Sequence, residues 1–365
     1  MIPAVLIATI IYIAYLVWEK AENDKALSSF KAVIHVNGIR GKTDTCRLID
    51  AHLRGAGMKI FTKTTGSDAA YITVNGDEIP IKRLGPASIH EQIRMLRLAK
   101  KQGAEVVVLE CMAVKPALQK IAQEQIVKGN INVITNVRYD HILEMGSTKQ
   151  SIAESLSGTV PEHGVLLTSD EAWFPFFQDK CREKGSRCVL CKETDGASEN
   201  EALAIGVGKE LGISEDGFRE HLSAYRADYG TRKVYKHGGL IFLNLFSVND
   251  PESTEKVLQK LLKNGDAAGR QLVFLYNHRA DRPDRLLLFE KYFFPNHAQD
   301  EIIVTGGNGS LAVKRLQRAG FHAQKAASWQ EAIRLADGKT LIGIGNIKGE
   351  AAQMIDELEG EMKNE

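Results

Sequence analysis

Residues 36–43, Val-Asn-Gly-Ile-Arg-Gly-Lys-Thr, join a short apolar run to a segment with helical spacing. The run before them, 32–36, predicts a strand, and apolar residues spaced three and four apart over 43–55 predict a helix. A glycine-rich turn at such a junction lets backbone N–H groups surround a triphosphate at the positive end of the helix. The turn therefore predicts an α/β fold that holds a nucleotide at the edge of a parallel sheet.

Each polar group of this turn has an expected task. Lys42 can reach the β- and γ-phosphates, and the Thr43 hydroxyl can bind Mg²⁺. The longer phosphate-loop pattern has glycine five residues before Gly41, where this chain has Val36, so the match is to the shorter G-x-x-G-K-T form. The other residues expected to contact the nucleotide here are Gly38, Ile39, Arg40, Gly41 and Asp44.

Further apolar runs extend this sheet and begin a second one. Strands are expected over 58–62, 105–110 and 131–135, a helix over 89–101, and a second series of strands over 240–246, 271–276, 301–306 and 340–345. The polar segment 224–239, which contains three glycines, predicts the boundary between two α/β domains. We expect an anchor over 1–20, a nucleotide-binding domain over 21–231 and a second domain over 232–365.

The first residues predict an attachment to a membrane. Residues 2–18 carry no charged side chain, and a charged pair at 19–20 ends the run. As a helix these positions reach about 25 Å, near the lower limit for a hydrocarbon core of about 30 Å. Neither basic residues before the run nor a small-residue cleavage site indicates a signal peptide, and a buried helix is the other alternative. Lysines after the run favour a body that faces the cytoplasm.

Polar side chains also follow two later strands of the predicted sheet. Glu110 ends the run 105–110, and Asn136 and His141 come after 131–135. The carboxyl ends of parallel strands lie at the edge where α/β proteins bind ligands. We expect Glu110 and His141 to join Thr43 as ligands of a metal, and Asn136 to contact the nucleotide.

A run of charges follows a strand in the second half of the chain. Residues 277–285 contain three arginines and two aspartates. Such a run is often a solvated surface, but guanidinium groups suit phosphate and carboxylates suit ribose hydroxyls. We therefore expect nucleotide contacts from Arg279, Asp281 and Arg282, and from Arg232 when the domains close.

Three weaker patterns have competing interpretations. Residues 249–253 predict at least a helix-capping turn, and the glycines of 343–349 are similar to a phosphate turn. Cys188 and Cys191, with Cys181 nearby, suggest either a zinc site or reduced thiols, and no second cysteine pair follows to complete a zinc site.

Composition removes several classes of protein. The 365 residues carry 47 basic and 46 acidic side chains, so no general basic surface is available for nucleic acid. A content of 44% hydrophobic and 25% charged residues excludes a disordered or polytopic membrane chain. Five cysteines do not pair into a disulfide framework, which favours a reducing compartment.

Taken in order, these motifs resemble the Mur ligase superfamily, which includes folylpolyglutamate synthetase, and more closely its PgsB/CapB family of poly-γ-glutamate synthase subunits. The resemblance extends from end to end and is carried by VNGIRGKT (36–43), KTTGSDA (63–69), ECMAVKP (110–116), N-V…D-H…M-G (136–146), N-D (249–250), NHRADRPDR (277–285) and GIGNIKG (343–349). It implies a P-loop central domain, a smaller Rossmann-like C-terminal domain and a single N-terminal transmembrane helix.

The resemblance also implies an activity, that of an ATP-dependent amide ligase. ATP would phosphorylate a γ-carboxyl of glutamate, and the amine of another glutamate would attack the acyl phosphate. Lys42, Glu110, His141 and Arg232 would be catalytic, with ATP and Mg²⁺ as cofactors. Expected partners are glutamate, growing poly-γ-glutamate, the cell membrane, PgsC/CapC- and PgsA/CapA-like membrane subunits and a second copy of the chain, but no nucleic acid.

Two departures from the superfamily keep alternatives open. The lysine that Mur and folate ligases carry after the D-H motif falls near Leu156, where the chain offers no amine for a second Mg²⁺ site. Asn249-Asp250-Pro251 stands where many of these ligases have A-H-N-P. The alternatives are a ligase for a different amino acid or acceptor, and a nucleotide-binding scaffold of a membrane complex without turnover.

Overall fold

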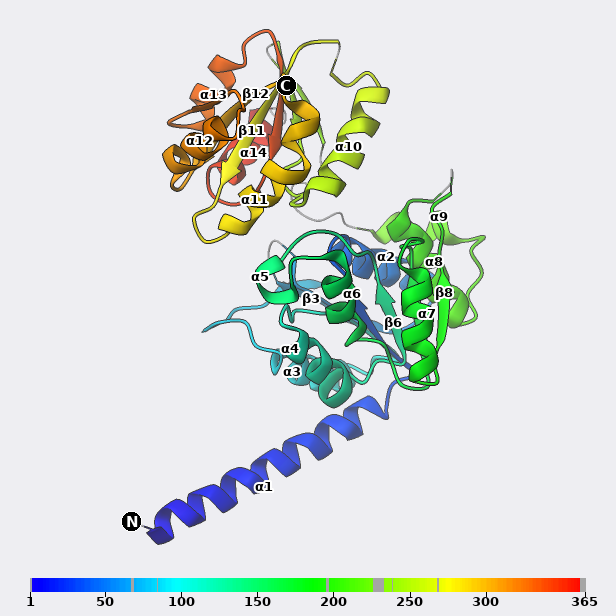
Figure 1. Ribbon diagram of the computed structural model, residues 1–365. Coiled ribbons are helices and arrows are strands. Elements are labelled where there is room, and N and C mark those ends of the chain that lie inside the picture. Colours follow the sequence, from blue (N-terminus) through cyan, green and yellow to red (C-terminus); the bar gives the residue numbers. More distant parts are fainter. Residues whose placement is uncertain are drawn as a thin grey trace. The chain divides into compact units, whose positions relative to one another are not determined.

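The computed structural model describes residues 2–66, 69–83, 85–194, 197–225, 233–237, 239–267 and 269–361 (Figure 1). The chain forms two compact units. The first comprises Met1–Val137 and Glu144–Asp228, and the second comprises Arg138–Leu143 and Tyr229–Glu365. A short segment from the first half of the chain thus belongs to the second unit, which no pattern in the sequence indicated.

The first unit is built on a mixed sheet of eight strands among the described residues, ordered β4-β3-β2-β5-β1-β6-β7-β8. Its parallel strands are β1 (Ala32–Asn37), β2 (Ile60–Thr64), β5 (Val106–Glu110), β6 (Ile131–Ile134), β7 (Val165–Thr168) and β8 (Arg187–Leu190). At one edge β3 (Ala70–Ile72) and β4 (Glu78–Pro80) pair antiparallel. The strands expected from the sequence pair in parallel. The antiparallel edge was not expected, and it forms because five connecting residues allow a hairpin and not a crossover.

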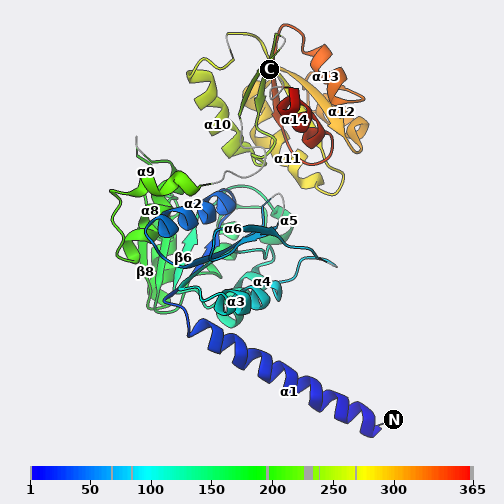
Figure 2. The same cartoon turned by 180° about the vertical axis from the view of Figure 1, so that it is seen from behind.

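Helices cover both faces of this sheet (Figures 1 and 2). Apolar side chains of α2 (Lys42–Gly55), α8 (Glu199–Glu210) and α9 (Phe218–His221) pack on one face. The other face is covered by α3 (Glu91–Lys101) and the π-helix η1 (Ala122–Val127). The remaining helices are α4 (Pro116–Ile121), α5 (Ile142–Met145), α6 (Lys149–Ser157), α7 (Phe174–Glu183) and η2 (Leu222–Ala224).

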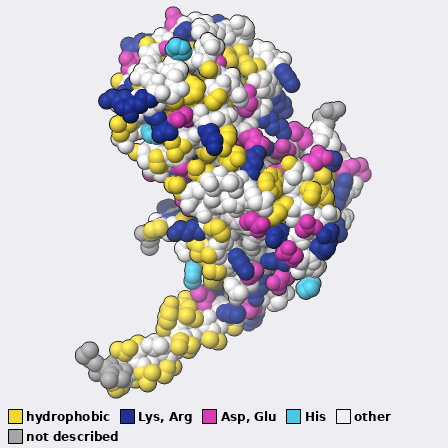
Figure 3. All heavy atoms as spheres, viewed as in Figure 1, with side chains coloured by type: hydrophobic (Ala, Val, Ile, Leu, Met, Phe, Trp, Pro, Cys, Tyr) yellow, Lys and Arg dark blue, Asp and Glu magenta, His cyan; other side chains and the backbone are white. Residues whose placement is uncertain are grey.

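The first helix, α1 (Ile2–Leu27), packs only through its final turns. Asn23 Nδ2 donates a 2.8 Å hydrogen bond to the carbonyl of Ile126, and the Arg97 guanidinium lies 5.2 Å from the centre of the Trp18 ring. Its earlier large apolar side chains are exposed, and Figure 3 shows α1 covered mainly by hydrophobic side chains. The helix continues beyond the expected anchor, as far as Leu27.

A membrane span was also expected at this helix. Within the described residues, none of the helices has both the length and the apolar character that crossing a bilayer requires. The structure therefore corrects the expectation of a transmembrane helix over 1–20. Residues 5–18, the uncharged stretch whose side chains are all described, reach about 21 Å as a helix, short of a core of about 30 Å.

The second unit repeats the layered arrangement around a sheet ordered β13-β12-β11-β14-β10-β9. Its parallel strands are β10 (Leu240–Asn244), β11 (Leu272–His278), β12 (Glu301–Gly306), β13 (Ala323–Lys325) and β14 (Thr340–Ile344), and β9 (Val234–His237) runs antiparallel to β10. One face packs against α10 (Pro251–Lys263), α11 (Pro283–Tyr292), α12 (Gly309–Arg318) and η3 (Phe294–His297), and the other against α13 (Trp329–Leu335) and α14 (Glu350–Glu361). The four strands expected after residue 240 are confirmed.

Two buried histidines make the first unit sensitive to acid. Burial lowers the pKa of His35 and of His52 to about 4. In the unfolded state these histidines have a pKa near 6.5, so at lower pH the unfolded state binds more protons than the folded state. The free energy of unfolding is therefore fully kept above about pH 6.5 and falls as the pH is lowered toward 4. We expect the melting temperature to drop steeply across this window.

A comparison of two variants tests whether the buried histidine rings cause this drop in melting temperature. His52→Gln removes one of the two groups, so its melting temperature should change less between pH 6.5 and 4.5 than that of the unaltered chain. The same change at the exposed His90 is the matched control and should leave the pH dependence as it was. An unaltered pH dependence in His52→Gln would contradict the assignment.

Candidate functional site

The glycine-rich turn between β1 and α2 has a backbone that requires glycine. Gly38 and Gly41 have φ angles of +123° and +81°, in the region that side chains disfavour. A Cβ atom on Gly38 would lie 2.1 Å from Thr135 Oγ1 and 2.7 Å from the Thr135 backbone nitrogen. One on Gly41 would lie 2.5 Å from Asn200 Oδ1. Thr135 and Asn200 therefore pack tightly against the turn, and α2 begins directly after it.

The loop after β6 supplies this packing. The Asn136 carbonyl accepts from the Ile39 N–H at 3.2 Å. The Asn136 side chain accepts from the Arg40 N–H and donates to the Arg40 carbonyl, both at 3.1 Å. Asn136, expected to contact nucleotide, thus holds the shape of the turn that would receive it.

Lys42, Thr43 and Glu110 are the predicted catalytic and metal-binding residues that lie in the first unit. Lys42 Nζ donates to the carbonyls of Gly38 at 2.7 Å and Ile39 at 3.3 Å, so its ammonium lies over the turn. Thr43 Oγ1 donates to Glu110 Oε2 at 3.0 Å. Glu110 Oε2 also accepts a hydrogen bond from the Thr65 N–H at 2.6 Å. Sequence positions 43, 65 and 110 thus meet at the carboxyl ends of β2 and β5.

This pair suits a divalent cation of the Mg²⁺ type. Glu110 is 3% exposed, and its carboxylate accepts a hydrogen bond from the Thr43 hydroxyl in the first turn of α2. Mg²⁺ prefers such hard oxygen ligands and completes its shell with water and phosphate oxygens. No group of three or more His, Cys, Asp or Glu side chains with metal-binding geometry occurs in the described parts of the chain. Thr43 and Glu110 are two side chains at this edge that could hold such a cation.

Asp44, the last residue of the turn expected to contact nucleotide, has both carboxylate oxygens hydrogen-bonded within the protein. Asn200 Nδ2 donates to its Oδ2 at 2.7 Å, and the Tyr225 hydroxyl donates to Oδ1. Asn200 also lies against Gly41, so α8 supports the turn in addition to the loop after β6.

A buried lysine beside this edge was not singled out as a site residue from the sequence. Lys63, on β2, is fully buried, and its Nζ lies 3.0 Å from Glu91 Oε1. Burial lowers the pKa of Lys63, and the Glu91 carboxylate, which also pairs with Arg83, opposes that shift. The signal in the sequence was its place as the first residue of the motif KTTGSDA (63–69), to which no site role was assigned.

His141 belongs to the second unit and is held there. It follows the buried Asp140, and its φ angle of +51° is rare for a residue with a side chain. An Arg282 guanidinium nitrogen lies 3.0 Å from His141 Nδ1. Because that lone pair accepts from Arg282, the ring would have to release the arginine to bind a metal through Nδ1. The metal-binding role of His141 stays a prediction.

The charged residues after β11 pair largely with one another and with His141. Arg279 forms two hydrogen bonds with the Asp281 carboxylate, at 2.9 and 2.5 Å, and they lower the pKa of Asp281. Arg282 contacts His141. The nucleotide contacts expected of Arg279, Asp281 and Arg282 stay predictions, and Arg232 lies outside the described residues.

The weaker patterns resolve into structural roles. Asp250 Oδ1 accepts from the Ser253 N–H at 2.9 Å and caps α10, as the sequence indicated. Gly343 lies within β14, where a Cβ would approach the Phe246 ring to 2.6 Å, so it serves packing. The five cysteines are free thiols.

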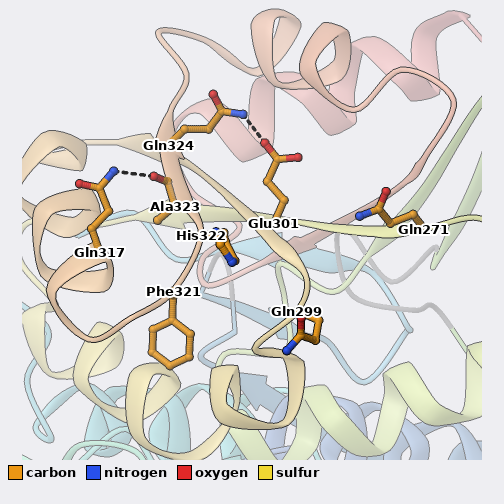
Figure 4. A pocket seen from close by; sticks show the side chains of 8 residues that line it. All are labelled: Gln271, Gln299, Glu301, Gln317, Phe321, His322, Ala323 and Gln324. Atoms are coloured by element: carbon orange, nitrogen blue, oxygen red, sulfur yellow. Dashed lines mark hydrogen bonds between the residues drawn. The ribbon is translucent and has the colours of Figure 1, made fainter.

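A pocket of about 590 Å³ lies in the second unit, away from the strand ends that bind ligands (Figure 4). Its lining comes from the amino-terminal ends of β12 and β13 and the residue before β11. Gln324 donates to Glu301, and Gln317 Nε2 donates to the carbonyl of Ala323 at 2.8 Å. These groups satisfy one another, and ligands of open α/β sheets bind at the opposite edge.

Two protein families match the chain. Residues 36–214 match the Mur ligase middle domain, and residues 231–361 match the poly-gamma-glutamate synthase CapB C-terminal domain. PGA synthase CapB of Bacillus subtilis (strain 168) is 32% identical over 97% of this chain and 96% of its own length. Capsule biosynthesis protein CapB of Bacillus anthracis is 30% identical over 98% of this chain and 82% of its own length.

Solved structures share the fold at lower identity. E. coli FolC in complex with ADP has a TM-score of 0.68 at 16% identity, covering 94% of this chain and 93% of that one. Bifunctional folylpolyglutamate synthase/dihydrofolate synthase from Yersinia pestis, complexed with AMPPNP and Mn ion, has a TM-score of 0.66 at 17% identity, covering 92% of this chain and 91% of that one. The Mur-ligase-like α/β fold expected from the sequence is confirmed.

Proposed function

The chain belongs to the CapB family of Mur-type ligases, and we propose that it uses ATP and Mg²⁺ to join the γ-carboxyl of one glutamate to the amine of another. As a member of this family it is an ATP-dependent, amide-forming ligase. The choice of glutamate is supported by the match to the poly-gamma-glutamate synthase CapB C-terminal domain and by the name of the B. subtilis relative, PGA synthase CapB. The use of ATP with a divalent cation is supported by the nucleotides and manganese in the FolC-like structures.

The observation that carries the proposal is the grouping of Lys42, Thr43 and Glu110 at one edge of the first sheet. An amine, a hydroxyl and a carboxylate meet there at the N-terminus of α2, and Asn136 holds the preceding turn through the N–H groups of Ile39 and Arg40. That set binds a triphosphate and leaves its terminal phosphoryl group at the sheet edge.

The chemistry proceeds in two balanced steps. An oxygen of the γ-carboxylate attacks the γ-phosphorus of ATP, and the bond to the β-phosphate oxygen breaks, which releases ADP. The amine nitrogen of the second glutamate then attacks the acyl carbon, loses a proton, and phosphate leaves with the bonding electrons.

The residues of the chain lower the cost of bringing two anions together. Lys42 neutralises charge that develops on the γ-phosphoryl oxygens, for which its ammonium needs only to leave the carbonyls of Gly38 and Ile39. Glu110 fixes the Thr43 hydroxyl. A divalent cation held by Thr43 and Glu110 would supply a Lewis acid that polarises the phosphate oxygens.

Product analysis tests this proposal. The full chain is incubated with ATP, Mg²⁺ and each amino acid in turn, and nucleotides, phosphate and peptides are quantified. Glutamate-dependent ADP and phosphate, with a γ-linked dipeptide or longer product, are expected. AMP and pyrophosphate would exclude the acyl-phosphate route, another amino acid would change the substrate, and ATP binding without turnover, even with membrane subunits added, would support a scaffold.

The exposed apolar surface of α1 supports a proposal about location. We propose that this surface holds the enzyme against the cytoplasmic face of a membrane that also contains its partner subunits, since exposed apolar patches of this kind mark contacts with membranes or proteins. Deleting residues 1–20 should move the protein from the membrane fraction to the supernatant in cell fractionation. A deleted protein that still sediments with membranes would place the attachment on another surface.

A further inference from the structure

The segment 138–143 is held by the second unit at each of its first four residues. Arg138 donates to Ser253 on α10, and the Tyr139 ring stacks on Tyr292 of α11 with centroids 4.5 Å apart. Arg282, which precedes α11, bonds the His141 ring. We call residues 138–143 the strap. Its attachment is spread over several side chains, so the strap is an integral part of this unit.

The deepest attachment joins Asp140 to Arg285. The carboxylate is 1% exposed and the guanidinium side chain 6%, and Asp140 Oδ2 lies 3.7 Å from an Arg285 nitrogen. The same guanidinium donates to Asn346 Oδ1, itself 2% exposed and located after β14. Asn277 completes the network by donating to the Asn346 carbonyl at 2.7 Å. Buried charges persist only where partners of this kind satisfy them.

Asp140 in turn fixes His141. Its Oδ1 accepts from the His141 backbone N–H at 2.9 Å, which stabilises the left-handed conformation of that residue. Its Oδ2 lies 3.7 Å from His141 Nε2. Because Arg282 can only donate, Nδ1 is the acceptor and the neutral ring carries its proton on Nε2, toward Asp140. Asp140 therefore fixes the backbone of His141, and Arg282 holds its ring.

We propose that Arg285 is a positioning residue that holds His141 through Asp140. No role was predicted for Arg285 from the sequence, where it is the last charge of the run 277–285. A non-glycine residue at positive φ is strained and needs surroundings that impose the conformation, and this network imposes it. The inference rests on the proposed function and on the catalytic role that the family resemblance implies for His141.

The first test measures the strap without using catalysis. Hydrogen exchange of peptides that cover 138–143 is followed by mass spectrometry in the full chain. Arg285→Met should speed exchange there about 10-fold, because the Asp140 carboxylate loses the Arg285 guanidinium and holds the His141 amide less firmly. Arg315→Met, which removes the surface ion pair with Glu290 in the same unit, should leave this exchange unchanged. Unchanged exchange in Arg285→Met would overturn the inference.

The second test separates positioning from a general loss of structure. Arg285→Met should lower kcat of ADP formation by about 10- to 100-fold, the usual effect of removing a residue that orients a functional side chain, with KM for ATP changed less. In a His141→Ala background the same change should cost nothing further. An equal loss in both backgrounds would show that Arg285 acts independently of His141 and would overturn the proposal.

Failure of this inference and failure of the proposed function would give different results. The double variant Arg285→Met/Asp140→Asn removes both buried charges and protects against misfolding of the single variant, and it should show the same fast exchange. If the unaltered chain formed no ADP with glutamate, the proposed function would fail, whereas the exchange measurement would still decide whether Arg285 holds the strap.

Discussion

Replacing Lys42 by alanine is expected to reduce kcat/KM for glutamate-dependent ADP formation about 10²- to 10³-fold, or roughly 3–4 kcal/mol of transition-state stabilisation. The ammonium lies over the turn and bonds two of its carbonyls, from which it can move to phosphate oxygens without rearrangement of the backbone. The loss should appear mainly in kcat, because charge develops on the phosphoryl group only as the transition state forms.

The control for this experiment is a lysine of the same unit that lies away from the turn. Lys59 is exposed just before β2, and Lys59→Ala should leave kcat/KM within about two-fold of the unaltered enzyme. Circular dichroism and melting temperature should be the same for both variants. A Lys42→Ala enzyme with near-normal turnover would mean that the turn does not hold the reacting phosphate.

Replacing Gly38 by alanine is expected to be the most damaging single methyl addition in the first unit. The φ angle of +123° strains any side chain, by roughly 1–3 kcal/mol. The new Cβ would also approach Thr135 Oγ1 to 2.1 Å and its backbone nitrogen to 2.7 Å, and such overpacking costs about 1–3 kcal/mol more. The melting temperature should fall by about 5–15 °C, and ATP binding measured by calorimetry should be lost.

A second glycine separates the two causes. Gly57 has a φ angle of +86°, and a Cβ there would meet nothing within 4 Å. Gly57→Ala therefore reports backbone strain alone and should lower the melting temperature less than Gly38→Ala, with ATP binding kept. The pair Gly38→Ala/Thr135→Ala removes the clash with the hydroxyl but not with the backbone nitrogen, so recovery should be partial. Equal effects at positions 38 and 57 would rule out the steric explanation.

Much of the fold could be predicted because its strands are short apolar runs bounded by turns. β1, β5, β6 and β10 lie within one to two residues of their expected ends. The hairpin of β3 and β4 was not expected, since strands of three residues at a sheet edge, partly exposed, carry little periodicity. The apolar run 2–18 indicated where α1 lies, but its continuation to Leu27 was not expected, and its packing through Asn23 depends on a tertiary contact with Ile126.

The candidate site was predictable where one local motif sets the geometry. Lys42 and Thr43 follow directly from the phosphate turn, and Glu110 from its place at a strand end. Asn200 and Arg285 could not be found in this way. Their partners lie 156 and about 145 positions away in the sequence, and only the folded chain brings them together.

The strap has a consequence for how this molecule can be divided. A cut at residue 229 gives a fragment that contains Arg285 and Asn346 but not Asp140, so a buried guanidinium loses its counter-charge. The missing piece also leaves the face of Tyr292 uncovered. Because the chain enters the second unit twice, no single point of cleavage yields two complete halves. Split-enzyme designs and crystallisation of isolated fragments would therefore have to graft residues 138–143 onto the C-terminal piece.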